Sequence, residues 1–299
     1  MKVGLPMYLQ FLFQESIKEV QELNPGYENH ASDVWLVKTE RQEVVVRSSR
    51  MVGNPNNDFW WGCRELFGID PRRVYDLENV NNTLNKITSL PVPKVINKGK
   101  EFSREFVVVE KLNGELVRSF IGQTSTVLQS LGEGLARIHQ YKQNYVGSPS
   151  GNFKVKLEEF NQHLKDTMAR LVSRFYFYNE PIKSKLDEIY NFIDELPSPE
   201  YSSFVLVDMD PTQFLSNKNV ITGLVDTEAY VIAPRELDFI GLEYVLDEES
   251  AKEFKSGYEK IMAIPDLTKC RYPYRYLYRL LSVQGKVDLD VWLNHKILF

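Results

Sequence analysis

The predicted strands of this 299-residue chain are concentrated in its first third, whereas helical patterns dominate the remainder. Two β-rich runs at 34–37 and 44–47 indicate a hairpin, and further short strands are predicted at 94–96 and 106–109. Residues 110–114 break the pattern and are expected to form a linker. Beyond it, apolar residues at helical spacing predict helices at 124–139, 155–177 and 181–196. This segregation predicts an α+β fold in two lobes rather than the strand–helix alternation of a doubly wound parallel sheet.

The strand-rich part also contains two predicted helices and a loop. A helix is predicted over residues 8–23, because apolar side chains recur there at helical spacing until a proline and a glycine follow. Residues 51–71 are rich in asparagine, proline and glycine and then carry Phe59-Trp60-Trp61, which indicates a loop with an aromatic insert. A second helix is predicted at 71–87, with a proline at its first position.

The charge and cysteine content exclude several classes of protein. Lysine and arginine number 36 against 41 aspartate and glutamate, a formal charge of −5, so no basic excess is available to neutralise nucleic-acid phosphates. Tyrosines and arginines that alternate over 271–279 could stack on bases, although an ordinary C-terminal helix also explains them. Cys63 and Cys270 lie far apart in no metal-binding pattern, and no apolar run approaches the roughly 18 residues that span a bilayer. We therefore expect a cytoplasmic protein whose partners include neither nucleic acid nor a membrane.

Two apolar strands in the helix-rich part are each followed by aspartate. Strand 204–207 precedes Asp208 and Asp210, strand 220–225 precedes Asp226, and the two strands are expected to form one small hairpin around a polar loop. Carboxylates at strand ends are well placed to converge on one site. Phosphoryl transfer needs such a pair, because one carboxylate orients the nucleophile or accepts its proton and another holds Mg²⁺ on the transferring phosphates. In the alternative interpretation these aspartates cap a turn and end a strand.

The residues around these carboxylates resemble the aminoglycoside phosphotransferase and choline kinase-like family, whose fold is that of the protein kinases. In that family the catalytic loop reads H-G-D-x-x-x-x-N, and a strand that ends in I-D-x-E follows. Asp208 matches the catalytic Asp, and Gln213 matches the Asn. Asp226 matches the metal-binding Asp, and Glu228 matches the acidic residue two positions later.

The resemblance extends along the whole chain. Asp238 matches a structural Asp that follows the metal-binding strand, and His139 is expected to be a hydrogen-bonded structural residue on an apolar helix. Further segments that are similar to the family occur in the family's order: Gly26-x-x-Asn29 before the first strand, Pro91-Val92-Pro93-Lys94-Val95, the hinge-like run 107–114, and the helix 131–139.

The resemblance implies a two-lobed protein kinase-like fold. Residues 1–110 would form a strand-rich, nucleotide-binding N-terminal lobe, and residues 111–299 a helical C-terminal lobe with the catalytic loop and the acceptor site. ATP and Mg²⁺ are the implied cofactors. Asp208 would act on the acceptor hydroxyl, and Gln213 and Asp226 would hold Mg²⁺.

The resemblance also implies a nucleotide site. Arg47, at the end of strand 44–47, would contact the α- and β-phosphates, since a guanidinium offers a permanent charge and a bidentate fork; the alternative is a solvated residue at a strand end. Glu78 is expected to pair with Arg47, with Glu65 as its competitor. Backbone groups of Glu110 and Leu112 would hold adenine.

The resemblance further implies an acceptor site. Asp210 and Glu228 are expected to line the mouth of a pocket for a cationic or polyhydroxyl acceptor.

The catalytic loop departs from the family pattern. Leu206 and Val207 replace the His and Gly before the catalytic Asp, and Gln213 is one methylene longer than Asn. Two functions follow: an ATP-dependent phosphotransferase that moves the γ-phosphate to a hydroxyl of a small molecule (an amino sugar, sugar or amino alcohol), or a catalytically impaired, nucleotide-binding pseudokinase with a regulatory or scaffold role. The sequence predicts no oligomeric state.

Overall fold

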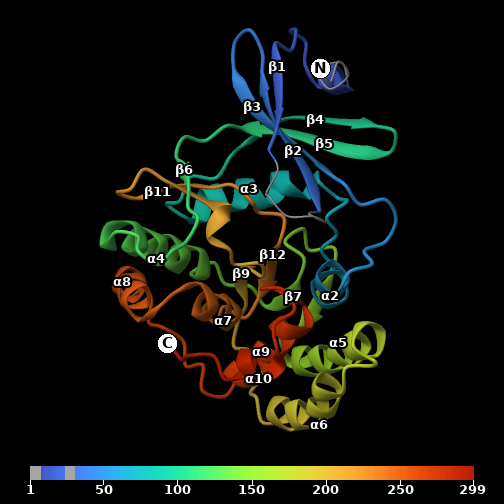
Figure 1. The fold of residues 1–299 in the computed structure, drawn as a ribbon, viewed down its shortest axis with the longest axis vertical. Coiled ribbons are helices and arrows are strands. Elements are labelled where there is room, and N and C mark those ends of the chain that lie inside the picture. Colours follow the sequence, from blue (N-terminus) through green and yellow to red (C-terminus); the bar gives the residue numbers. More distant parts are fainter. Residues whose placement is uncertain (1–7, 24–30) are drawn as a thin grey trace.

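The computed structural model describes residues 8–23 and 31–299, and its described part has two lobes (Figure 1). The upper lobe contains a five-stranded antiparallel sheet with the strand order β1-β2-β3-β5-β4, and the lower lobe is mostly helical. The fold is therefore the predicted α+β arrangement, and the predicted hairpin is β2 with β3. The strands of this sheet are β1 (Glu19–Glu22), β2 (Ser32–Lys38), β3 (Glu43–Ser49), β4 (Val95–Glu101) and β5 (Arg104–Glu110).

The two faces of this sheet are both covered. Val44 and Val46 of β3 pack on one face with Trp35, Phe106 and the N-terminal residues Leu9 and Leu12. Val45 and Val107 point to the opposite face, where Leu77 of helix α3 (Asp76–Ile87) covers them. Because side chains alternate along a strand, Arg47 lies on the same face as Val45 and points toward α3 and the lower lobe.

The predicted helix over residues 8–23 is wrong. The segment forms a single 3₁₀ turn, η1 (Gln10–Leu12), and then the edge strand β1, which pairs with β2. The Gln10 side chain stabilises the non-helical path by donating to the Phe13 and Glu15 carbonyls at 3.2 and 2.9 Å and accepting from the Ile17 amide at 3.3 Å. The open edge of β2 offers the backbone of this segment partners within the fold, whereas an isolated short helix on the surface is only marginally stable.

The predicted loop over residues 51–71 contains a helix, α2 (Asp58–Phe67). Its boundaries carry signals that the aromatic run obscured: the Asn57 side chain accepts from the Trp60 amide at 2.8 Å, and Gly68 ends the helix at a φ of 70°. α2 packs beside α5 of the lower lobe, where a Cβ on Gly62 would lie 3.2 Å from Leu171 (Figure 1). The following helix, α3, begins five residues later than predicted.

The lower lobe consists of helices around two small antiparallel sheets. Its helices are α4 (Ser125–His139), α5 (Phe160–Phe175), α6 (Glu180–Asp194), α7 (Glu236–Val245), α8 (Glu248–Tyr258), α9 (Arg271–Leu280), α10 (Leu289–Leu293) and the 3₁₀ turns η2 (Leu157–Glu159) and η3 (Pro211–Gln213). Its strands are β6 (Glu115–Leu116), β7 (Tyr145–Gly147), β8 (Lys154–Lys156), β9 (Ser203–Leu206), β10 (Phe214–Ser216), β11 (Ile221–Leu224) and β12 (Tyr230–Ala233). Among the residues described, no helix combines the length and apolar character that a membrane crossing requires.

The single hairpin predicted for strands 204–207 and 220–225 is replaced by two separate pairings. β9 pairs with β12, whereas β11 pairs with β10, and the two pairs belong to different sheets. The turn η3 redirects the chain between β9 and β10, which the polar composition of this loop did not reveal. The segments that follow β9 and β11 nevertheless meet, because the backbone amide of Val225 donates to the Gln213 carbonyl at 2.8 Å.

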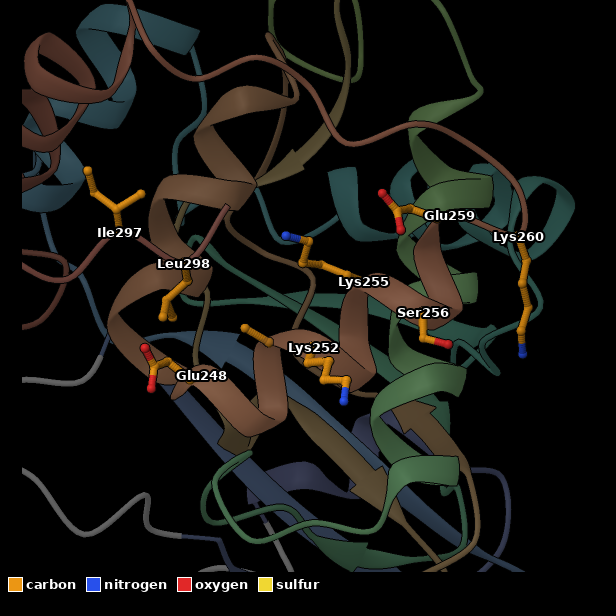
Figure 2. A pocket seen from close by; sticks show the side chains of 9 residues that line it. Glu248, Lys252, Lys255, Ser256, Glu259, Lys260, Ile297 and Leu298 are labelled. Atoms are coloured by element: carbon orange, nitrogen blue, oxygen red, sulfur yellow. The ribbon is translucent and has the colours of Figure 1, made fainter.

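A surface cavity of about 670 Å³ lies on the outside of the lower lobe (Figure 2). α8 supplies most of its lining, including Lys252 and Lys255. Glu259, directly after the helix, and the C-terminal residues Ile297 and Leu298 complete it. Its charged side chains come from neither of the strand ends that carry the predicted catalytic residues.

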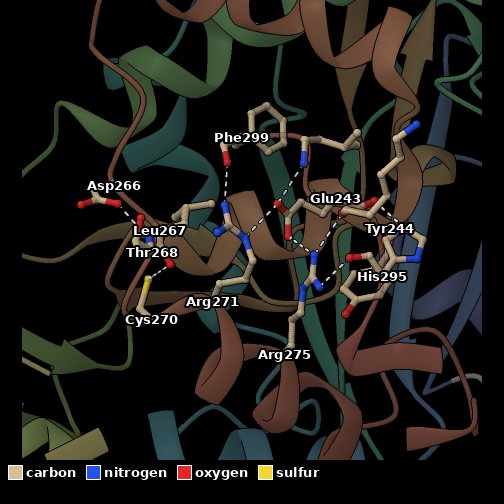
Figure 3. A network of polar contacts seen from close by, with 12 residues as sticks. Glu243, Tyr244, Asp266, Leu267, Thr268, Cys270, Arg271, Arg275, His295 and Phe299 are labelled. Atoms are coloured by element: carbon tan, nitrogen blue, oxygen red, sulfur yellow. Dashed lines mark hydrogen bonds and ion pairs between the residues drawn. The ribbon is translucent and has the colours of Figure 1, made fainter. Parts of the chain in front are cut away.

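The C-terminal segment is tied to the helical core by a buried carboxylate (Figure 3). Glu243 of α7 is fully buried and accepts from Arg271 at 3.2 Å, from Arg275 at 2.7 Å and from the Leu298 amide at 3.2 Å. Arg271 also donates to the Phe299 carbonyl at 2.5 Å. The alternating arginines and tyrosines of 271–279 therefore lie in α9, most of whose residues are buried. This agrees with the interpretation of the segment as an ordinary C-terminal helix.

Replacing Glu243 by glutamine is expected to destabilise the fold by about 3 kcal/mol, because two arginines would remain buried without their countercharge. Urea unfolding followed by circular dichroism measures this change. Glu248→Gln is the matched control, since Glu248 is exposed and pairs with Lys296, which is exposed as well. Equal unfolding midpoints for the two variants would contradict the role given to Glu243.

Candidate active site

The end of β9 is held by a buried carboxylate, Asp238. Its Oδ1 accepts from the Leu206 amide at 2.9 Å, and its Oδ2 lies 2.9 Å from His139 Nε2. Burial raises the pKa of Asp238, and the contact with His139 opposes that rise. Asp208 follows β9 after only one further residue, so these hydrogen bonds determine where its backbone lies.

His139 has the structural role expected from the sequence. It is fully buried on α4, and its Nδ1 lies 2.8 Å from the Tyr258 hydroxyl, which accepts from Arg235 at 2.9 Å. Because an arginine can only donate, the Tyr258 proton is available to Nδ1 and the Nε2 proton to Asp238. The network joins α4, α7 and α8 behind the loop that carries Asp208.

Asp210 and Gln213 cap the turn η3. Asp210 Oδ1 accepts from the Thr212 amide at 2.8 Å and from the Thr212 hydroxyl at 2.5 Å. The Gln213 Oε1 accepts from the Asp210 amide at 3.3 Å, which completes a capping box. Asp210 therefore caps a turn, as in the alternative interpretation of these aspartates given by the sequence. A metal at Gln213 would have to use the second lone pair of the same amide oxygen.

Asp208 lies in an environment that disfavours its charged form. Burial, together with the charges of Asp226 and Asp210, raises the pKa of Asp208 to about 7. Asp226 and Asp208 therefore lie within electrostatic reach of each other, as their positions at two strand ends predicted. Such a concentration of carboxylate oxygens favours a divalent cation, which would relieve the repulsion.

The donor set fits Mg²⁺ that is shared with a substrate. Within the described ranges, no three His, Cys, Asp or Glu side chains are grouped closely enough to hold a metal by themselves. Mg²⁺ in phosphoryl-transfer sites typically takes one or two carboxylates and completes its shell with phosphate oxygens and water. Asp226, whose side chain is 45% exposed, can supply such a ligand, with Gln213 beside it.

Arg47 reaches from β3 of the upper lobe into this cluster. Its Nη2 lies 2.8 Å from Asp226 Oδ1 and 3.0 Å from Glu228 Oε1, and its Nε donates to the same Glu228 oxygen at 3.1 Å. Its Nη1 donates to the Val225 carbonyl at 2.9 Å. Arg47 is thus buried and paired, which excludes the interpretation as a solvated strand end.

The expected pair of Arg47 with Glu78 is not the one formed. Glu78 of α3 bonds Lys98 of β4 at 2.5 Å, and its competitor Glu65 bonds Arg170 of α5 at 2.6 Å. The sequence separation placed Glu78 on the correct helix but did not determine its orientation. α3 contacts the Asp226 loop through a neutral hydrogen bond instead, from the Thr227 hydroxyl to Asn81 at 2.5 Å.

Glu228 faces the upper lobe. Its Oε1 accepts from Arg47, and its Oε2 accepts from the Ser32 hydroxyl of β2 at 2.5 Å. Burial raises the pKa of Glu228, and Arg47 opposes that rise. Both oxygens are therefore engaged by the sheet rather than turned to an acceptor pocket. Ser32 and Asn81 were missed from the sequence, because a single polar residue outside any motif carries no signal.

The hinge residues lie at the junction of the two lobes. The Glu110 amide donates to the Lys94 carbonyl at 3.0 Å, and the Glu110 carboxylate accepts from the Lys94 amide at 3.1 Å. A Cβ on Gly223 of β11 would lie 3.1 Å from the Leu112 side chain. The expected Gly26-x-x-Asn29 nucleotide loop lies outside the described residues.

The fold and these carboxylates define a phosphotransferase of the kinase-like class. Residues 19–271 match the sequence model of the phosphotransferase enzyme family. This match spans most of the chain, and the chain belongs to that family. No curated protein sequence matches the chain significantly.

Solved structures of similar fold cover almost the whole chain at low sequence identity. A macrolide 2′-phosphotransferase from Brachybacterium faecium has a TM-score of 0.59 at 12% identity, over 95% of this chain and 96% of that one. A thermostable mutant of aminoglycoside phosphotransferase APH(4)-Ia, in a ternary complex with ADP and hygromycin B, has a TM-score of 0.63 at 15% identity, over 93% and 89%. A putative fructosamine-3-kinase from Haemophilus somnus has a TM-score of 0.58 at 15% identity, over 96% and 94%. These likenesses show the fold.

The raised pKa of Asp208 predicts a pH dependence of stability in the nucleotide-free protein. The folded protein keeps the Asp208 proton up to about pH 7, whereas the unfolded chain loses it near about 3.9. Between these values the folded state binds more protons, so the free energy of unfolding falls as the pH rises. Asp208→Asn removes this proton uptake, and its stability relative to the wild type is expected to increase from pH 4 to pH 7 and then level off.

Denaturant unfolding of both proteins at closely spaced pH values measures the difference. All other titrating groups are shared, so the difference reports the titration of Asp208 and its coupling to Asp226 and Asp210. A difference between variant and wild type that stays constant over this pH range would contradict the environment described for Asp208.

Proposed function

We propose that the protein is an ATP-dependent phosphotransferase that moves the γ-phosphate to a hydroxyl of a small molecule, with a sugar, amino sugar or amino alcohol as the acceptor class. The observation that carries this proposal is the convergence of Asp208 and Asp226 from two strand ends, with Arg47 of the upper lobe reaching the same point. A base, a metal-binding carboxylate and a phosphate-binding cation are the parts that phosphoryl transfer needs.

Each residue has a defined part in this reaction. Asp208 orients the acceptor hydroxyl and takes its proton as the oxygen bonds the γ-phosphorus and the bond to the leaving ADP oxygen breaks. A base whose pKa lies near 7 can both accept this proton and release it afterwards. Asp226 and Gln213 would hold Mg²⁺, which when bound would neutralise charge on the transferring phosphates. Arg47 contacts the nucleotide phosphates with its guanidinium fork.

Further support comes from proteins of the same fold. Solved relatives hold ADP with hygromycin B, ADP with spectinomycin, or GDP with kanamycin. Adenine would lie at Glu110 and Leu112, between a nucleotide-binding lobe at 1–110 and an acceptor-binding lobe at 111–299. The acceptor class, the use of ATP and a cytoplasmic location are part of this proposal.

The unusual catalytic loop is compatible with turnover. Leu206 and Val207, which replace the family's His and Gly, are fully buried in the core. The Leu206 amide still donates its hydrogen bond to the Asp238 carboxylate, so the position of Asp208 does not depend on a histidine in the loop. The substitution therefore changes what supports Asp208 without removing the support.

The reaction is tested by Asp208→Asn, which is expected to lower phosphate transfer about a thousandfold while leaving nucleotide binding in place. Transfer from labelled ATP to a panel of amino sugars, sugars and amino alcohols gives the rate, and thermal shift with ATP, with and without Mg²⁺, gives binding. Glu248→Gln, on the outside of α8, is the control that keeps both. Binding without transfer to any member of the panel would support the pseudokinase, and no thermal shift in any condition would rule out both functions.

A further inference from the structure

The buried guanidinium of Arg47 takes its carboxylate partners from the loop that carries the metal-binding aspartate. Asp226 and Glu228 lie two positions apart in this loop, and both contact Arg47 Nη2 within 3.0 Å. The helix that covers the sheet supplies neither carboxylate, because Glu78 is bonded to Lys98. The guanidinium of Arg47, which would contact the nucleotide phosphates, is thus held in place by the lower lobe rather than by α3.

The two carboxylates differ in how firmly they are held. Glu228 has a side chain that is only 9% exposed, and it accepts from Arg47 Nε and from the Ser32 hydroxyl, while its Oε1 lies 3.0 Å from Arg47 Nη2. Asp226 is 45% exposed and contacts Arg47 through one nitrogen. Asp226 can therefore turn away from Arg47 at the loss of one hydrogen bond, whereas Glu228 would lose its bonds to both Arg47 and Ser32.

We propose that Glu228 is the positioning residue of Arg47 and that Asp226 is an exchangeable partner, which releases Arg47 Nη2 to the nucleotide phosphates when it turns to the metal. This inference rests on the proposed function, because it assigns roles within the same nucleotide site. It replaces the acceptor-binding role that the sequence suggested for Glu228. Glu228 contacts neither phosphate nor acceptor and acts only through Arg47.

The arrangement also joins the two lobes. Ser32 of β2 and Arg47 of β3 both bond Glu228, and Arg47 bonds the Val225 carbonyl, so the sheet is fastened to the loop after β11 at three points. Glu228 thereby fixes the Nε side of the guanidinium and leaves Nη2 as the edge that can change partner. An arginine suits this division because its donors lie in a rigid plane.

Binding of ADP without Mg²⁺, measured by calorimetry, distinguishes the two carboxylates. Glu228→Gln is expected to weaken ADP binding about tenfold, because Arg47 loses a charge-assisted hydrogen bond that orients it. Asp226→Asn is expected to leave Mg²⁺-free ADP binding equal or tighter, since it removes a competitor for Nη2, and to abolish the gain in affinity that Mg²⁺ gives the wild type. Glu78→Gln is the matched control and is expected to bind ADP like the wild type.

Glu228→Gln and Asp226→Asn are expected to differ in the direction in which they change ADP affinity, and this difference separates a positioning role from a charge effect. If the carboxylates acted only through their charge, both neutral variants would bind ADP more tightly, because each removes a negative charge near the phosphates. Tighter or unchanged binding by Glu228→Gln, or weaker binding by Glu78→Gln, would overturn the positioning role while leaving the proposed function intact. A wild type that binds no nucleotide would overturn the proposed function, and this role with it.

A second variant keeps the test valid if Glu228→Gln does not fold. Ser32→Ala removes the hydroxyl that bonds Glu228 Oε2 and leaves every charge in place. It is expected to weaken ADP binding in the same direction by about threefold, as the loss of one hydrogen bond would. Unchanged ADP affinity in a folded Ser32→Ala would overturn the anchoring of Glu228.

Discussion

The placement of the candidate catalytic residue depends on Asp238, a carboxylate that is fully buried. It accepts from the Leu206 amide at the end of β9 and from His139 on α4, and so fixes two elements of the lower lobe to each other. A buried carboxylate is costly unless its oxygens are bonded, and here both oxygens have partners. Because Asp208 lies two residues beyond Leu206, its position follows from this network even though the loop itself lacks a histidine.

The second constraint is an excess of negative charge that the protein alone does not balance. The charges of Asp226 and Asp210 act on Asp208, and that of Asp226 acts on Glu228 as well. Within the described part of the chain, Arg47 is paired with Asp226 and Glu228. Burial, together with the charges of Asp226 and Asp210, keeps the Asp208 proton bound, and the Asp226 side chain remains 45% exposed. A cation that arrives with phosphates would relieve the repulsion, so the electrostatics of the ligand-free site already favour a metal–nucleotide complex.

The sequence predicted those features that depend on local pattern and strand direction. The two lobes, the β2–β3 hairpin and the meeting of Asp208 with Asp226 follow from apolar alternation and from carboxylates at strand ends. Features that depend on a distant partner were missed: residues 19–22 became a strand because β2 offered an edge, and Glu78 turned to Lys98 although its spacing suited Arg47. The cap at Asn57 was a readable signal for α2, but the adjoining aromatic run hid it.

The path of the chain between β3 and α3 limits how far the two lobes can move apart. After β3 the chain descends to α2, whose Trp60, Cys63, Leu66 and Phe67 are buried in the core of the lower lobe, and then returns to α3 beneath the sheet. The charge of Asp208 raises the pKa of Cys63 in addition to burial, which places α2 beside the catalytic loop. The strand that carries Arg47 is therefore anchored to the lower lobe twice, through its guanidinium and through α2. Separation of the two lobes would therefore have to break the contacts that Ser32 and Arg47 make with Glu228 and also to displace α2 from the core of the lower lobe.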